Sequence, residues 1–111
     1  MQNVKVVLLI EMKVPSQHQT GILESIHDYL PLVRAEPGVE AFYTTAREDD
    51  PGALVFFEVY ASQAALDFHL QQEYTKQFLA TLNSKIAGEK VKTKLIEVGS
   101  SQNIIRPYKK R

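Results

Sequence analysis

Two stretches of this sequence alternate with a period of two residues, as β-strands do, and both are apolar on two faces. In residues 4–14 every even-numbered position is apolar, and Val7 and Leu9 add apolar side chains to the middle of the other face. In residues 54–60 one face carries Leu54, Phe56, Glu58 and Tyr60, and the other carries Val55, Phe57 and Val59. A sheet built from these strands has to be covered on both sides, which strongly restricts the possible folds.

A helix is predicted after the first strand. Its apolar stripe consists of Ile22, Ile26, Leu30 and Val33. Ser16 is the predicted N-cap, and Gln19 three residues later completes a capping box. Pro31 is expected to kink the last third of the helix, and the turn residues Pro37-Gly38 follow its end.

The middle of the chain predicts a β-hairpin. Residues 39–47 are rich in β-branched and aromatic side chains, and the polar turn 48–52 separates them from residues 54–60. Because the connection is short, the two strands are expected to pair with each other.

A second helical region and a last strand complete the pattern. Ser62 can cap this helix, and a break is predicted near Gln71-Gln72. The second segment carries Tyr74, Phe78, Leu82 and Ile86 at spacings of four. Gly88 suits the position after its end, and residues 91–98 form the fourth strand.

The element order β-α-β-β-α-β predicts an α+β ferredoxin-like fold, with a four-stranded antiparallel sheet and both helices on one face. The opposite face would then expose Val7, Leu9, Val55, Phe57 and Val59. An apolar patch of that size usually marks an interface, and a two-fold homodimer would bury it on both copies. We therefore expect one domain over residues 1–98 that forms a homodimeric α+β barrel.

Residues 99–111 are predicted to form a C-terminal tail. Ile104, Ile105 and Tyr108 are apolar positions in an otherwise polar segment. Docking on the partner subunit and disorder remain equal alternatives for this tail.

Composition excludes several classes of function. With 13 basic and 13 acidic residues in 111, the net charge is zero, and no nucleic-acid partner is expected. The absence of cysteine excludes disulfides and thiol nucleophiles. The apolar run Val6–Ile10 is too short for a signal peptide or a membrane span, so a cytoplasmic protein without a membrane partner is expected.

Glu58 and His69 are the candidate catalytic residues. Glu58 lies on the predicted inward face of its strand among aromatic residues, where a carboxylate must be paired or have a raised pKa. His69 follows Leu66 by three residues, on the helix side expected to pack inward, and is its candidate partner. Such a pair could accept a proton from a phenol or an enol. Alternatively, the two side chains only tie the helix to the sheet.

Three tyrosines could offer hydroxyl groups to an oxygenated substrate: Tyr43, Tyr60 and Tyr74. The alternative is that each is an aromatic of the core with its hydroxyl at the edge. The three histidines lie far apart in sequence and show no metal-binding spacing, so no metal site is predicted.

Three segments follow one another along the chain: the Glu36-Pro37-Gly38-Val39 turn, the Val55–Tyr60 strand (VFFEVY) and the Ala64–Leu70 helix (AALDFHL). In this order and spacing they resemble the antibiotic biosynthesis monooxygenase (ABM) domain. The resemblance covers roughly residues 4–98. It implies a small homodimer that oxidises a phenolic, quinol or enolic compound without a cofactor. In that reading His69 is the base, Glu58 orients it, and Phe56, Tyr60, Tyr74 and Tyr43 bind the substrate.

The sequence also departs from the family pattern. Many relatives have Pro-His-Phe or Pro-His-Tyr where this chain has Glu73-Tyr74-Thr75, so a mechanism that needs the second histidine is in doubt. The haem-degrading branch is not expected, because its key positions correspond here to Ile10, Tyr60 and Leu79. Two other functions stay open: an isomerase or tautomerase of a small hydroxy-carbonyl signalling molecule, and a non-catalytic dimer that binds a small molecule.

Overall fold

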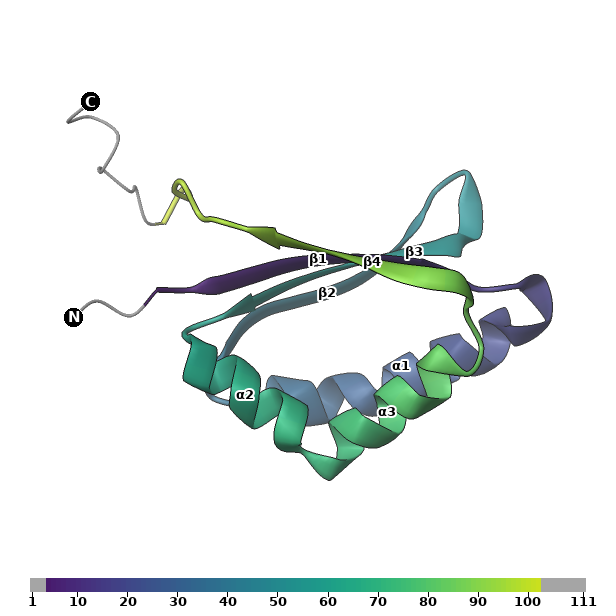
Figure 1. The fold of residues 1–111 in the computed structure, drawn as a ribbon, viewed down its shortest axis with the longest axis horizontal. Coiled ribbons are helices and arrows are strands. Elements are labelled where there is room, and N and C mark those ends of the chain that lie inside the picture. The colour runs from purple at the N-terminus through teal and green to yellow at the C-terminus, as the bar shows by residue number, and fades with distance from the viewer. Residues whose placement is uncertain (1–3, 103–111) are drawn as a thin grey trace.

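The structure, a computed structural model, describes residues 4–102. Its elements are β1 (Val6–Lys13), α1 (Ser16–Arg34), β2 (Val39–Arg47), β3 (Asp50–Tyr60), α2 (Gln63–Gln71), α3 (Glu73–Asn83) and β4 (Ala87–Leu95). The strands form one antiparallel sheet in the order β2-β3-β1-β4. All three helices lie on the same side of it (Figure 1). The predicted ferredoxin-like arrangement is confirmed, with α2 and α3 together occupying the position of the second helix. Ile104, Ile105 and Tyr108 lie outside the described residues.

The first helix begins differently from the prediction. Pro15 is the N-cap and Ser16 is the first helical residue, so the Ser16 hydroxyl makes no capping hydrogen bond. The Gln19 side chain instead donates through Nε2 to the carbonyl oxygen of Val14, at 3.1 Å. The expected capping box was therefore wrong by one position, because Pro15 with its fixed φ already supplies the extended N-cap conformation. The helix continues through Pro31 to Arg34.

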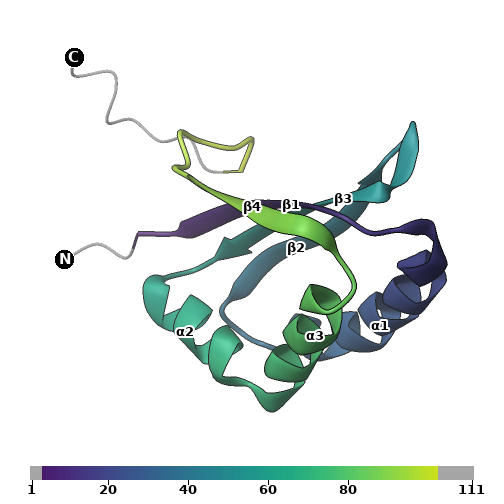
Figure 2. The same ribbon diagram turned by 45° about the vertical axis from the view of Figure 1, so that its right-hand side comes forward.

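The second helical region breaks where the pattern predicted. The Oγ of Ser62 accepts a hydrogen bond from the Ala65 N–H at 3.1 Å and caps α2. Gln72 has an extended backbone and serves both as the C-cap of α2 and as the N-cap of α3. Figure 2 shows α2 and α3 running in different directions on the helix side of the sheet. Because the chain turns at Gln72, each helix buries its own apolar side chains, Leu66 in α2 and Phe78 and Leu82 in α3.

The last strand starts and ends earlier than expected. α3 ends at Asn83, and Gly88 lies inside β4 with φ +75°, so its predicted place at a helix end was wrong. Ala87 pairs with Lys13 of β1, next to an irregularity in the register. The left-handed conformation of Gly88 thus serves the start of a strand beside a bulge, where glycine is favoured. Pairing with β1 determines where β4 begins, and the local sequence gives no sign of this pairing.

The two faces of β3 differ as predicted. Its helix-facing side chains are Leu54, Phe56, Glu58 and Tyr60, and all are buried. Val55, Phe57 and Val59 on the other face are half-buried. Register places Leu9 opposite Phe57, and Tyr43 of β2 on its other side. The open face is therefore apolar across three neighbouring strands.

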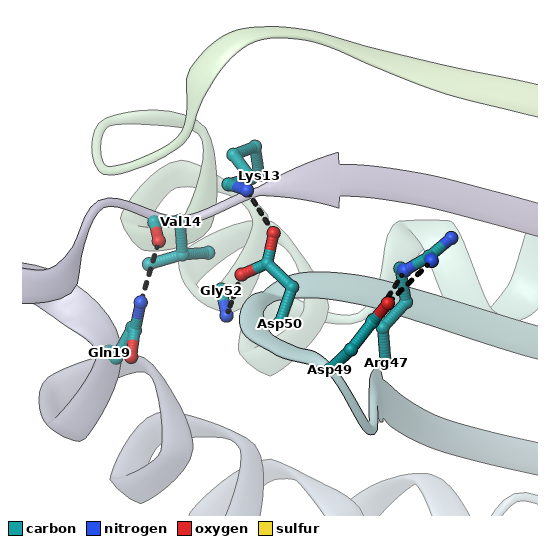
Figure 3. A network of polar contacts seen from close by, with 7 residues as sticks. All are labelled: Lys13, Val14, Gln19, Arg47, Asp49, Asp50 and Gly52. Atoms are coloured by element: carbon teal, nitrogen blue, oxygen red, sulfur yellow. Dashed lines mark hydrogen bonds and ion pairs between the residues drawn. The ribbon is translucent and has the colours of Figure 1, made fainter.

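The tip of the β2–β3 hairpin is held by polar contacts to the end of β1 (Figure 3). Asp50 forms an ion pair with Lys13 and accepts a hydrogen bond from the Gly52 N–H at 3.1 Å. The Val14 N–H donates to the Gly52 carbonyl at 2.7 Å. A Cβ atom on Gly52 would lie 2.5 Å from the Val14 oxygen, so only glycine allows this approach. These contacts extend β3 back to Asp50, four residues before the predicted start.

Candidate active site

A small cavity of about 70 Å³ lies between the helices and the sheet. Its wall is mostly apolar and includes Leu8, Ile10, Met12, Phe42, Phe56, Leu66, Leu70, Phe78, Leu79 and Leu82. The other lining residues are Tyr29, Glu58, His69, Lys90 and Lys92. A pocket with apolar walls and a few convergent polar groups is the usual form of a small-molecule site.

His69 is the centre of a buried hydrogen-bond chain. It is only 3% exposed, and its Nδ1 lies 2.9 Å from Oε2 of Glu36. Its Nε2 lies 2.9 Å from the hydroxyl of Tyr29. An ionised carboxylate can only accept, so we assign the imidazole proton to Nδ1. In this tautomer Nε2 accepts from the Tyr29 hydroxyl, so hydrogen bonds at both ring nitrogens fix the orientation of the imidazole.

Tyr29 connects this histidine to the cavity. Its hydroxyl also lies 3.2 Å from Oγ1 of Thr75, a fully buried residue at the start of α3. Its ring stacks on that of Phe78, with ring centroids 4.0 Å apart. Burial is the main reason why the pKa of Tyr29 is raised well above its usual value. Tyr29 is therefore a hydrogen-bond donor at neutral pH, and its stacked ring holds the hydroxyl in place.

Glu36 follows the last turn of α1 and is 4% exposed. Its Oε2 also accepts a hydrogen bond from the Tyr74 hydroxyl at 2.6 Å. Within residues 4–102, the buried Oε1 has no hydrogen-bond partner. Burial, and to a smaller extent the hydrogen bond to Glu36, raises the pKa of Tyr74 to about 12. Two donors thus share one oxygen of Glu36, which holds the carboxylate against His69.

The turn after Glu36 packs tightly on α2. A Cβ atom on Gly38 would lie 2.5 Å from Cβ of Ala65. The Gly38 carbonyl accepts a hydrogen bond from the Ala61 N–H at 2.9 Å. Because only a residue without a side chain fits here, Gly38 brings the end of α1 close to the helix that carries His69.

Glu58 is the carboxylate on the cavity wall itself. Its Oε1 accepts a hydrogen bond from the Tyr60 hydroxyl at 2.7 Å. Burial raises the pKa of Glu58, while that hydrogen bond and the charges of His69, Lys92 and Lys90 lower it by less. The pKa of Tyr60 is itself raised far above the usual range by burial and by the Glu58 charge.

The structure brings Glu58 and His69 to the same cavity but gives them different partners from those expected. His69 is held by Glu36, and Glu58 by Tyr60. Phe56 lines the cavity, whereas Tyr60 and Tyr74 do not line it and instead donate hydrogen bonds to Glu58 and Glu36. Tyr43 is 62% exposed on the opposite face of the sheet, away from the cavity.

Sequence reasoning missed Glu36 and Tyr29. Tyr29 lies on the apolar stripe of α1, three residues after Ile26, and in sequence looks like an ordinary core aromatic. Glu36 belongs to a segment recognisable only as a turn. Tyr29 and Glu36 are 40 and 33 positions from His69, so only the tertiary structure reveals these contacts.

A larger groove of about 390 Å³ lies between α1 and β2. Its polar lining consists of His27, Arg34 and Glu40, all exposed. Because the larger groove holds no buried chain of polar groups, we regard the smaller cavity as the candidate site.

In the described part of the chain, no group of three or more metal-ligating side chains could hold a metal ion. Nor is any helix among residues 4–102 both long and apolar enough to cross a membrane.

Comparison with solved structures places this fold among known ones. A crystal structure described as antibiotic biosynthesis monooxygenase superposes with a TM-score of 0.79 at 20% identity, covering 84% of this chain and 98% of that one. Rv0793 from Mycobacterium tuberculosis gives 0.79 at 21% identity, covering 87% and 98%. Identity this low supports the fold alone.

Sequence comparison identifies the family of this chain. The uncharacterized protein sll1783 of Synechocystis is 23% identical over 99 residues, which are 89% of this chain and 67% of that protein. The family model described as "Antibiotic biosynthesis monooxygenase" matches residues 5–81, more than half of the chain. This chain therefore belongs to the antibiotic biosynthesis monooxygenase family.

Proposed function

We propose that this protein is an oxygenase that acts on a small phenolic, quinol or enolic compound without a cofactor. The observation that carries the proposal is the chain Glu36–His69–Tyr29, in which a buried imidazole contacts a hydroxyl on the wall of an apolar cavity. Family membership supports the reaction class.

The proton would move in two linked transfers. The substrate gives its acidic proton to the oxygen of Tyr29, which in the same step gives its own proton to Nε2 of His69. The raised pKa of Tyr29 makes a free tyrosinate unfavourable, so the hydroxyl acts as a relay. Glu36 would then stabilise the imidazolium, in place of the orienting role expected for Glu58.

The substrate anion would react with dioxygen directly. For a substrate with an acidic CH₂ group, the carbanion bonds one oxygen atom, and the O–O bond then breaks. One oxygen stays as a carbonyl and the other leaves as water with the two hydrogens of the carbon. Four electrons leave the carbon and dioxygen takes up four, so no further reductant is needed. The apolar wall would shield the intermediate from water.

Oxygen uptake with a panel of quinols and enolic compounds tests this function. We expect His69→Asn and Tyr29→Phe each to lower kcat by about 10²- to 10⁴-fold, the usual contribution of a positioned acid or base. Tyr43→Phe removes the same hydroxyl from the opposite face and should leave the rate unchanged. An unaffected rate in His69→Asn would remove the histidine from catalysis.

Other outcomes identify the alternatives. Anaerobic turnover of a hydroxy-carbonyl compound would assign the isomerase function instead. Ligand binding with thermal stabilisation but no turnover would favour the non-catalytic dimer, which is consistent with both nitrogens of His69 already being hydrogen-bonded. Visible absorbance or stoichiometric metal in the purified protein would contradict the cofactor-free reaction.

We also propose that two copies pair through their open sheet faces. Tyr43 is exposed there, and Phe57 and Leu9 are only half-buried. Apolar side chains spread over neighbouring strands favour a two-fold interface. Size-exclusion chromatography with light scattering tests this, and a stable monomer at micromolar concentration would contradict it.

A further inference from the structure

β4 brings two lysines to the cavity. Register pairs Lys92 with Ile10, and Ile10 faces the cavity, so Lys92 lies on the helix side of the sheet. Lys90 is two residues away on the same face and is the one partly buried residue of this strand. Both lysines line the cavity that contains His69 and Glu58.

The charges of this wall do not balance. Glu58 is the one carboxylate that lines the cavity, against two lysines. Within residues 4–102, neither Lys90 nor Lys92 forms an ion pair, although each acts on Glu58 through its charge. Burial and the neighbouring Lys92 lower the pKa of Lys90, and Glu58 offsets this only in part. The cavity wall therefore carries at least one lysine more than its single carboxylate can neutralise.

We propose that Lys90 and Lys92 bind an anionic substituent, a carboxylate or a phosphate, on the otherwise apolar ligand of this cavity. The anion would lie at the β4 edge, and the ring would extend between the helices and the sheet toward Tyr29. A charged group held by two ammonium groups would fix which end of the ligand meets Tyr29. This deepens the proposed function by naming its substrate class, and it depends on that function only in assuming a small-molecule ligand.

Equilibrium binding to the full-length protein tests the inference without turnover. The probes are 4-hydroxybenzoate, 4-hydroxyphenyl phosphate and the neutral phenol, titrated calorimetrically. We expect at least one anionic probe to bind about tenfold more tightly than phenol, the order of magnitude of one charge-assisted hydrogen bond. Comparison of the two anions then distinguishes carboxylate from phosphate.

Variants test whether the two lysines cause the tighter binding of the anionic probe. Lys90→Gln and Lys92→Gln should each reduce it several-fold, and the double variant should abolish it. Lys94→Gln is the matched control, because Lys94 pairs with Leu8 on the same face of β4 but does not line the cavity. Unfolding curves of the variants check that the fold is retained.

Four results would overturn the inference. The first two are equal affinity for all three probes and no binding of any of them. The other two are a preference for the anionic probe that survives in the double variant, and an equal loss of that preference in Lys94→Gln. The last result would show only a general effect of net charge.

The anion site and the proposed oxygenase can fail separately. If the preference for the anionic probe depends on the lysines but no compound drives oxygen uptake, the proposed oxygenase fails and the anion site stands. If quinols are oxidised but the three probes bind with equal affinity, the anion site fails and the proposed oxygenase stands.

Discussion

The two faces of the sheet differ in how far their side chains are buried. On the helix side, Glu58, Tyr60 and their apolar neighbours are covered by the chain itself, and the polar atoms are paired across elements. On the open side, Val55 and Phe57 are half-buried and Tyr43 is exposed, and the charged groups Glu11 and Lys13 of β1 are exposed as well. The same strands therefore carry a chemical site on one face and an apolar surface on the other.

This difference shows where side chains with shifted pKa values can occur in so small a chain. Among the described residues, the buried polar and titratable side chains lie on the helix side, and it is there that burial raises carboxyl and phenol pKa values. The open side offers contact area without a site. Its residues should respond to protein concentration, while those of the helix side should respond to substitution and pH.

The largest expected effect compares adjacent residues of β3. Phe56→Ala removes a ring that is 3% exposed on the helix side and should lower the free energy of unfolding by about 3–5 kcal/mol. Phe57→Ala, on the open face, should lower it by about 1 kcal/mol or less in dilute monomer. Its effect should grow with protein concentration if the open faces pair. Urea unfolding at two concentrations measures both, and equal effects would mean that the faces do not differ as described.

An intermediate effect is expected at the turn that positions Glu36. Gly38→Ala would bring a methyl group against Ala65 and should destabilise the fold by about 1–3 kcal/mol. Gly21→Ala, where a Cβ meets nothing within 4 Å in the middle of α1, should stabilise it by about 0.5–1 kcal/mol. Thermal unfolding compares the two, and a neutral Gly38→Ala would show that the turn can move away from α2 without loss.

The smallest expected effect is the pH dependence that Glu58 contributes. Its pKa is higher in the folded state than the ordinary value of 4.5, so the folded state binds this proton more tightly than the unfolded state. The resulting stabilisation is fully present below about pH 4.5 and is lost as pH rises through the folded-state pKa. The slope contributed by one proton is at most about 1.4 kcal/mol per pH unit.

Glu58→Gln checks this sign, because the amide oxygen can still accept from Tyr60. The variant should gain stability relative to wild type between pH 4 and pH 7. Glu24→Gln on the exposed side of α1 removes the same charge and serves as the reference. A relative loss of stability over this range would mean that Glu58 is stabilised in its charged form.

The local sequence was sufficient for the elements and for the faces of the strands. Period-two alternation assigned Phe56 and Glu58 to the inward side, and the helix break near Gln72 followed from local pattern. The start of β4 was missed because its pairing with Lys13 depends on a strand more than 70 residues earlier, a distance across which no local pattern extends.

What the sequence by itself determined is thus the ferredoxin-like architecture and the presence of Glu58 and His69 on one inward-facing layer. What only the tertiary structure decided is which groups touch: Glu36 and Tyr29 on His69, Tyr60 on Glu58, and the two lysines at the edge. The physical reason is the geometric precision that each kind of contact requires. Apolar periodicity determines which face of a helix or strand is buried, and that face stays buried when a helix shifts slightly along the sheet. A hydrogen bond requires its two heavy atoms within about 3 Å in a suitable direction, which only the final packing of α1, α2 and the sheet provides.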